Sequence, residues 1–126
     1  MTQLPENLRY ALTHEWVTVS DETTIHVGIT DFAQQQLGDL VYIGMPDIGR
    51  RVVAQEACAT LESVKTASEI HSPVSGEIIA INTELQDSPE LVNDDPYGTW
   101  IFSVKADDLA GLGQLVNAEG YQDSIS

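Results

Sequence analysis

Residues 61–76 read L-E-S-V-K-T-A-S-E-I-H-S-P-V-S-G, and this stretch decides how the chain folds. Before Lys65, residues 57–64 alternate between small or apolar and polar side chains, which favours a β-strand. After Lys65, residues 66–70 form a second strand-like run, closed by Ser72-Pro73 and Ser75-Gly76. The pattern predicts a β-hairpin with Lys65 at its tip.

Lys65 is one of only two lysines, the other being Lys105. A hairpin tip holds a side chain in water on a rigid backbone, so its amine is accessible to a modifying enzyme. The ordinary alternative is that Lys65 is a solvated surface charge. Position alone does not separate the two interpretations.

Alternating hydrophobicity and turn residues divide most of the remaining chain into further short strands, typical of a mainly β protein. We expect them at Trp16–Val19, Thr24–Ile29, Asp39–Met45, Arg50–Val53, Gly76–Asn82 and Trp100–Val104.

Short helices are expected between these strands. Thr30 can cap a helix that ends at Gly38, and Asp31 suits its positively polarised first turn. Residues 85–93 predict a loop with a helical turn that begins at Ser88-Pro89. Leu109, Leu112 and Leu115 keep rough helical spacing, which indicates a short C-terminal helix among several glycines.

A faint internal repeat relates the two halves of the chain. G-D-L-V-Y-I at 38–43 parallels G-E-I-I-A-I at 76–81, and S-V-K at 63–65 parallels S-V-K at 103–105. Strands that cannot bury a face alone pack in pairs, so the repeat predicts two sheets facing each other. Lys105 would then be the counterpart of Lys65, at a strand end.

The composition bounds both size and partners. With 126 residues and 42% hydrophobic side chains, the chain predicts one domain, with a core over about 10–105 and a short helical tail over 106–126. A net charge of −15 disfavours nucleic acid and anionic membranes as partners, and favours basic proteins or plain solubility. No signal or transit sequence is recognised, and the single Cys58 fits a reducing cytoplasm of bacterial type.

No catalytic constellation stands out. The three histidines have neither the spacing nor the cysteine partners of a metal site, and no nucleophile or phosphate-binding motif occurs. We therefore expect a carrier and not an enzyme, with no metal.

Several motifs together resemble the glycine cleavage system H-protein family. They are E-S-V-K-T-A-S-E at 62–69, S-P-V-S-G-E at 72–77, H-E-W-V at 14–17, V-G-I-T-D-F-A-Q at 27–34 with L-G-D at 37–39, and P-E-L-V-N at 89–93 with P-Y at 96–97. This resemblance covers about residues 10–105. It implies a barrel-sandwich hybrid of the lipoyl and biotinyl carrier type, with two antiparallel sheets and short flanking helices.

The same resemblance implies a function, a cofactor and partners. Lipoate would be joined to Lys65 by an amide bond and would swing between enzymes. It would take an aminomethyl group from glycine decarboxylase to an aminomethyltransferase, and reducing equivalents to dihydrolipoyl dehydrogenase. Lipoylating enzymes would be further partners.

A cleft for the loaded arm is also implied by the resemblance. It would lie near the segments that include Thr13, Glu15, Gln36 and Glu69. The two glutamates would accept hydrogen bonds from the amine of the cargo, and Thr13 a weaker one. Gln36 stands where some members of the family have histidine.

Rival carriers fit the hairpin less well. A biotinyl carrier usually has methionine on both sides of its lysine, whereas Val64 and Thr66 flank Lys65. Lipoyl domains of 2-oxoacid dehydrogenases usually have an acidic residue where Val64 stands. A lipoate relay protein, which donates its lipoyl group to other enzymes, and a plain interaction domain remain open.

Overall fold

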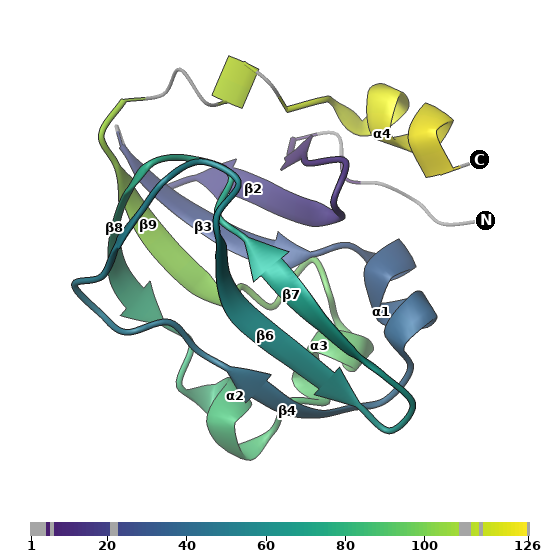
Figure 1. The fold of residues 1–126 in the computed structure, drawn as a ribbon. Helices are drawn as coiled ribbons and strands as arrows, with labels where there is room; N and C mark the ends of the chain where they lie inside the picture. Colours follow the sequence, from purple (N-terminus) through teal and green to yellow (C-terminus); the bar gives the residue numbers. More distant parts are fainter. Residues whose placement is uncertain (1–4, 6, 21–22, 109–111, 114, 126) are drawn as a thin grey trace.

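The computed structural model describes residues 5, 7–20, 23–108, 112–113 and 115–125, and it contains two antiparallel sheets with short helices at their edges (Figure 1). The strands are β1 Arg9–Tyr10, β2 Glu15–Val19, β3 Thr24–Ile29, β4 Leu40–Gly44, β5 Arg51–Val52, β6 Ala57–Ser63, β7 Ala67–His71, β8 Gly76–Ile81 and β9 Phe102–Ala106. The helices are α1 Asp31–Leu37, α2 Glu84–Asp87, α3 Leu91–Asp94 and α4 Ala118–Ile125. The expected fold class is confirmed.

The two sheets enclose one main core. The larger sheet has the strand order β1-β2-β3-β9-β8-β5 and the smaller has the order β4-β6-β7. Val27 and Ile78 from the larger sheet and Leu61 and Ile70 from the smaller belong to the same buried cluster. Burial of such aliphatic side chains supplies the main stabilisation of the fold, at about 1.5–3 kcal/mol each.

Helix α1 has the limits that the sequence predicts. The Thr30 side chain accepts a hydrogen bond from the Ala33 amide, and the Gly38 amide donates to the Gln34 carbonyl. Gly38 has a φ of 81°, a conformation that glycine adopts without the steric cost of a Cβ atom. This turn leads directly into β4 beside the hairpin tip.

The other helices differ from expectation. Residues 85–93 were predicted to be a loop with one helical turn beginning at Ser88, but the structure has two helices, α2 and α3, on either side of it. Each is four residues long and has no side-chain cap, so burial of Leu85 and Val92 holds them in place. In the C-terminal region α4 begins at Ala118, later than the leucines indicated, and Leu109 lies outside the described residues.

The predicted repeat is visible in the strand pairing. β4 pairs with β6 in the small sheet, and β8 pairs with β9 in the large sheet, both antiparallel. The register shifts between Leu40 and Tyr42 in the first pair and between Ile78 and Ala80 in the second. These are equivalent positions of the two repeated strings, so the repeat corresponds to one strand pair in each sheet.

Helix α4 packs on the far side of the large sheet from the main core. The Tyr121 ring stacks on Tyr10 of β1, with ring centroids 5.1 Å apart, and Trp16 and Leu8 complete this second cluster. Helix α4 contacts β1, and Figure 1 shows it near β2. None of the helices in the described part of the chain is long and apolar enough to cross a membrane.

Candidate functional site

The turn between β6 and β7 has two residues at its tip, Val64 and Lys65. The Ser63 amide donates to the Thr66 carbonyl at 2.8 Å, which closes the turn on one side. On the other side the Thr66 amide donates to the Ser63 hydroxyl at 3.1 Å. The side chain of Ser63 therefore helps to fix the backbone that presents Lys65.

The tip is also anchored to the turn that follows α1. The Val64 amide donates to the Asp39 carbonyl at 3.2 Å. A Cβ atom on Gly38 would lie 3.3 Å from Lys65 Cε, so the lysine side chain passes close over this glycine. Lys65 is exposed, and the end of its side chain lies over Gly38, the residue that ends α1.

Beside the tip lies a small cavity of about 110 Å³, here called the cleft. The four residues expected to hold the arm, Thr13, Glu15, Gln36 and Glu69, all line it. They come from the turn before β2, from β2 itself, from α1 and from β7. Its apolar lining is supplied by Ile29, Ala33, Leu37 and Leu61.

Glu15 is the most buried polar member of the cleft, with 1% of its surface exposed. It shares its face of β2 with Val17 of the main core, so its carboxylate points between the two sheets. One carboxylate oxygen accepts a hydrogen bond from the Thr13 hydroxyl. The other accepts from the His71 amide at 2.8 Å and contacts His71 Nδ1 at 3.2 Å.

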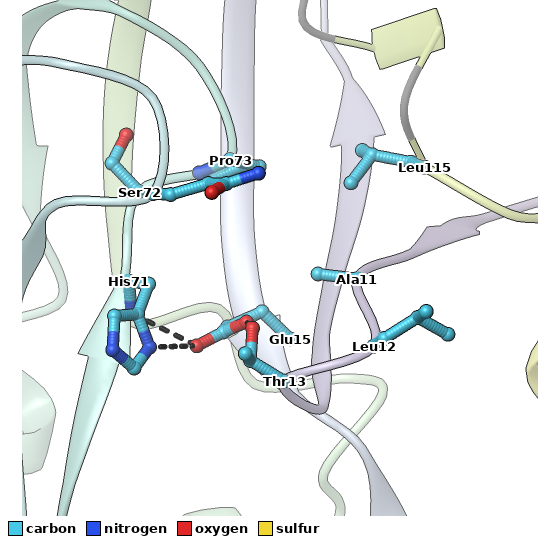
Figure 2. A pocket seen from close by; sticks show the side chains of 9 residues that line it. Ala11, Leu12, Thr13, Glu15, His71, Ser72, Pro73 and Leu115 are labelled. Carbon is cyan, nitrogen blue, oxygen red and sulfur yellow. Dashed lines mark hydrogen bonds and ion pairs between the residues drawn. The ribbon is translucent and has the colours of Figure 1, made fainter. Parts of the chain in front are cut away.

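Figure 2 shows this arrangement from a neighbouring cavity of about 370 Å³, which shares Thr13 and Glu15 with the cleft. Leu12, Pro73 and Leu115 form much of its apolar wall. The imidazole of His71, at the end of β7, faces the Glu15 carboxylate across the gap between the sheets. Glu15 thus joins the cleft to this larger cavity.

His71 was not predicted to belong to the site. The available signal was strand parity, because residues 69 and 71 lie on the same face of β7 and Glu69 was already a candidate. Its contact with Glu15, 56 positions away, depends on how the two sheets pack.

His14 also lines the cleft, and its ring contacts Tyr121 of the C-terminal helix α4. Its backbone has a φ of 79°, and Nδ1 lies 2.7 Å from the Tyr121 hydroxyl, which lies 2.7 Å from Thr30 Oγ1. Burial lowers the pKa of His14, with an opposing effect from the neighbouring Glu15 carboxylate. At neutral pH this ring is an uncharged part of the cleft wall.

The other conspicuous residues lie elsewhere. Lys105 is in β9, paired with Thr24 on one side and Glu77 on the other, and not in a turn. His26 was expected to face solvent, but it is half-buried and its Nδ1 lies 2.5 Å from the Ser103 hydroxyl. Cys58 is buried, and burial raises the pKa of its thiol to about 12.

Comparison with known proteins places this geometry in context. The family model described as Glycine cleavage H-protein matches residues 8–126. A protein of Alkalilimnicola ehrlichii named Glycine cleavage system H protein is 55% identical over 127 residues, covering 100% of this chain and 98% of its own. The protein of the same name from Methylococcus capsulatus is 53% identical and covers 97% of this chain and 96% of its own.

A solved structure is similar as well. The crystal structure of a glycine cleavage system H protein from Mycobacterium marinum superposes with a TM-score of 0.89 at 35% identity. The match covers 97% of this chain and 98% of that one.

Proposed function

The chain belongs to the glycine cleavage H-protein family, and from this premise we propose that Lys65 carries lipoate through an amide bond. Its function is that of a lipoyl carrier in the glycine cleavage system. The observation that supports Lys65 is its position on a hydrogen-bonded two-residue tip beside a cleft with both polar and apolar walls.

The residues around the tip fit a lipoyl-lysine. The amine is exposed, as a lipoylating enzyme requires, and the turn that holds it is fixed by Ser63, Thr66 and Asp39. The cleft offers Leu37 and Leu61 to the hydrocarbon part of an arm and carboxylates to a cationic end. By contrast, Lys105 lies within a paired strand beside Glu77.

When bound, lipoate supplies a disulfide that accepts an aminomethyl group or two electrons. The protein supplies the tether and a surface for its partners. We propose that glycine decarboxylase, an aminomethyltransferase and dihydrolipoyl dehydrogenase visit this surface in turn, that lipoylating enzymes act on the same tip, and that the protein catalyses no step itself. We place this exchange in the cytoplasm of a bacterial cell. We also propose that the 126 residues form a single domain with its core at about 10–105.

Between visits the cleft protects the cargo. The loaded group is a primary amine, largely protonated, on a carbon that water attacks, and Glu15 can accept a charge-assisted hydrogen bond from it. Glu69, which is exposed at the cleft edge, and Thr13 and Gln36 make weaker contributions. Glu15 is the strongest of the four because its burial reduces screening by water.

The test is reconstituted glycine cleavage, followed as NAD reduction with the partner enzymes in excess. The lipoylated parent should support turnover, and Lys65→Arg should not, because arginine keeps the charge but is not a substrate for amide formation. Lys105→Arg is the matched control and should behave as the parent. Turnover with Lys65→Arg, or its loss with Lys105→Arg alone, would contradict the proposal.

A further inference from the structure

The buried carboxylate of Glu15 already has a neighbour able to change charge, the imidazole of His71. Two donors from this one residue reach Glu15 Oε2, the backbone amide at 2.8 Å and the ring Nδ1 at 3.2 Å. The two residues belong to different sheets, Glu15 to β2 and His71 to β7. Their contact therefore crosses the gap at which the cleft and the larger cavity meet.

Hydrogen bonding fixes which ring nitrogen carries the proton when His71 is neutral. An ionised carboxylate can only accept hydrogen bonds, so Nδ1 must be the N–H donor toward Glu15. The second ring nitrogen, Nε2, then keeps its lone pair, and Figure 2 shows it on the side of the ring away from Glu15. With 32% of its side chain exposed, the ring is partly open to solvent.

We propose that His71 is a positioning residue that sets the strength with which Glu15 holds cationic cargo. Neutral His71 orients the carboxylate through two N–H donors and adds no charge beside it. Protonated His71 places a cation 3.2 Å from the same carboxylate, which cancels part of that charge and repels a second cation. The cleft then releases an ammonium group more readily as pH falls, an inference that rests on the cleft role of the proposed function.

Other titratable and charged groups lie around Glu15 and His71. His14 precedes Glu15 in the chain, and burial lowers its pKa, which disfavours its charged form. Tyr121 on α4 and Cys58 on β6 each have a pKa raised to about 12, so neither titrates near neutrality. Glu56 is held by Arg50 at 2.9 Å, and Glu69 at the cleft edge is tested directly by substitution.

The decisive variant is His71→Asn. An asparagine amide nitrogen can replace Nδ1 as a neutral donor to Glu15, and the backbone amide of residue 71 remains, but the titrating ring is gone. The measurement is the lifetime of the isolated loaded protein from about pH 5.5 to 8.5, followed as formaldehyde release. His26→Asn is the matched control, since His26 contacts Ser103 and lies outside the cleft lining.

The parent and His71→Asn should have similar lifetimes at the alkaline end. At the acidic end the parent should lose cargo about fivefold faster than His71→Asn, a size typical of one partly screened charge pair. The His26→Asn and Glu69→Gln curves should keep the pH dependence of the parent. Parallel curves for the parent and His71→Asn would overturn the role of His71.

A second readout needs no cargo. In the unloaded protein, ¹⁵N NMR should show neutral His71 as the Nδ1–H tautomer, and Glu15→Ala, which removes the side-chain acceptor, should weaken this preference. An Nε2–H tautomer in the parent would overturn the inference. If Glu15→Gln keeps the parent lifetime at every pH, the proposed cleft role itself fails. If Glu15→Gln has a shorter lifetime but the parent and His71→Asn curves are parallel, only the role of His71 is rejected.

Discussion

The proposed function depends chiefly on two residues, Lys65 and Glu15, which lie in different surroundings. Lys65 is exposed at the hairpin tip, where its amine is accessible from solvent. Glu15 is 1% exposed and is held by Thr13 and His71, so only a group that enters the cleft can reach it. Substitution of Lys65 should abolish loading, whereas substitution of Glu15 should shorten the life of what is loaded.

Cys58 is expected to be unreactive in the folded protein. Burial raises the pKa of its thiol to about 12, compared with about 8.5 for an exposed thiol. Alkylation at pH 8 should be at least about a hundredfold slower in the native than in the unfolded protein, because only the thiolate reacts. Labelling followed by mass spectrometry measures this, and equal rates in the two states would contradict it.

The same thiol predicts a pH dependence of stability. A folded-state pKa above the unfolded one means that its stabilising contribution is complete below about pH 8.5 and is lost as pH rises toward about 12. In urea unfolding, the parent should therefore lose more stability than Cys58→Ala between pH 8 and pH 10. An identical loss in both proteins would show that the thiol ionises equally in the two states.

For single residues, the sequence predicted the position of Lys65 in its turn better than the burial of Glu15. The position of Lys65 follows from two local strands and a turn, which alternation and proline placement reveal. The burial of Glu15 depends on β2 meeting β7 of the other sheet, and local pattern carries no information about that packing. For the same reason His71 was not identified as a partner of Glu15.

Among the secondary-structure elements, the β6–β7 hairpin determines where the amine is presented. Exchanging the tip residues, with Val64→Lys and Lys65→Val, should preserve the fold because both side chains are exposed. Lipoylation should fall by on the order of a hundredfold, because transfer depends on the orientation of the amine. Val64→Ala, which keeps Lys65 in place, is the control, and normal lipoylation of the exchanged variant would count against a geometric requirement.

The helices show which elements local sequence can specify. Helix α1 was predicted because Thr30 and Gly38 are caps whose hydrogen bonds are local. Helices α2 and α3 lack side-chain caps and are too short to be stable by themselves, so their formation depends on burial of Leu85 and Val92. No pattern within the segment indicates that burial.

The whole molecule carries a net charge of −15, which should influence its encounters with partners. If the partners present basic surfaces, added salt screens the attraction and weakens association. In the reconstituted reaction, the apparent KM of the decarboxylase for this protein should rise on the order of tenfold between about 0.05 and 0.5 M sodium chloride, with kcat changed less. A KM independent of salt would restrict the charge to a role in solubility.

The central claim, that Lys65 alone carries the lipoyl group, is tested most directly by mass spectrometry of the protein expressed with lipoate. Intact mass should show one lipoyl group, and peptide mapping should place it on Lys65, with none in Lys65→Arg and one in Lys105→Arg. A lipoyl group that persists in Lys65→Arg, or one that maps to Lys105 in the parent, would contradict the account.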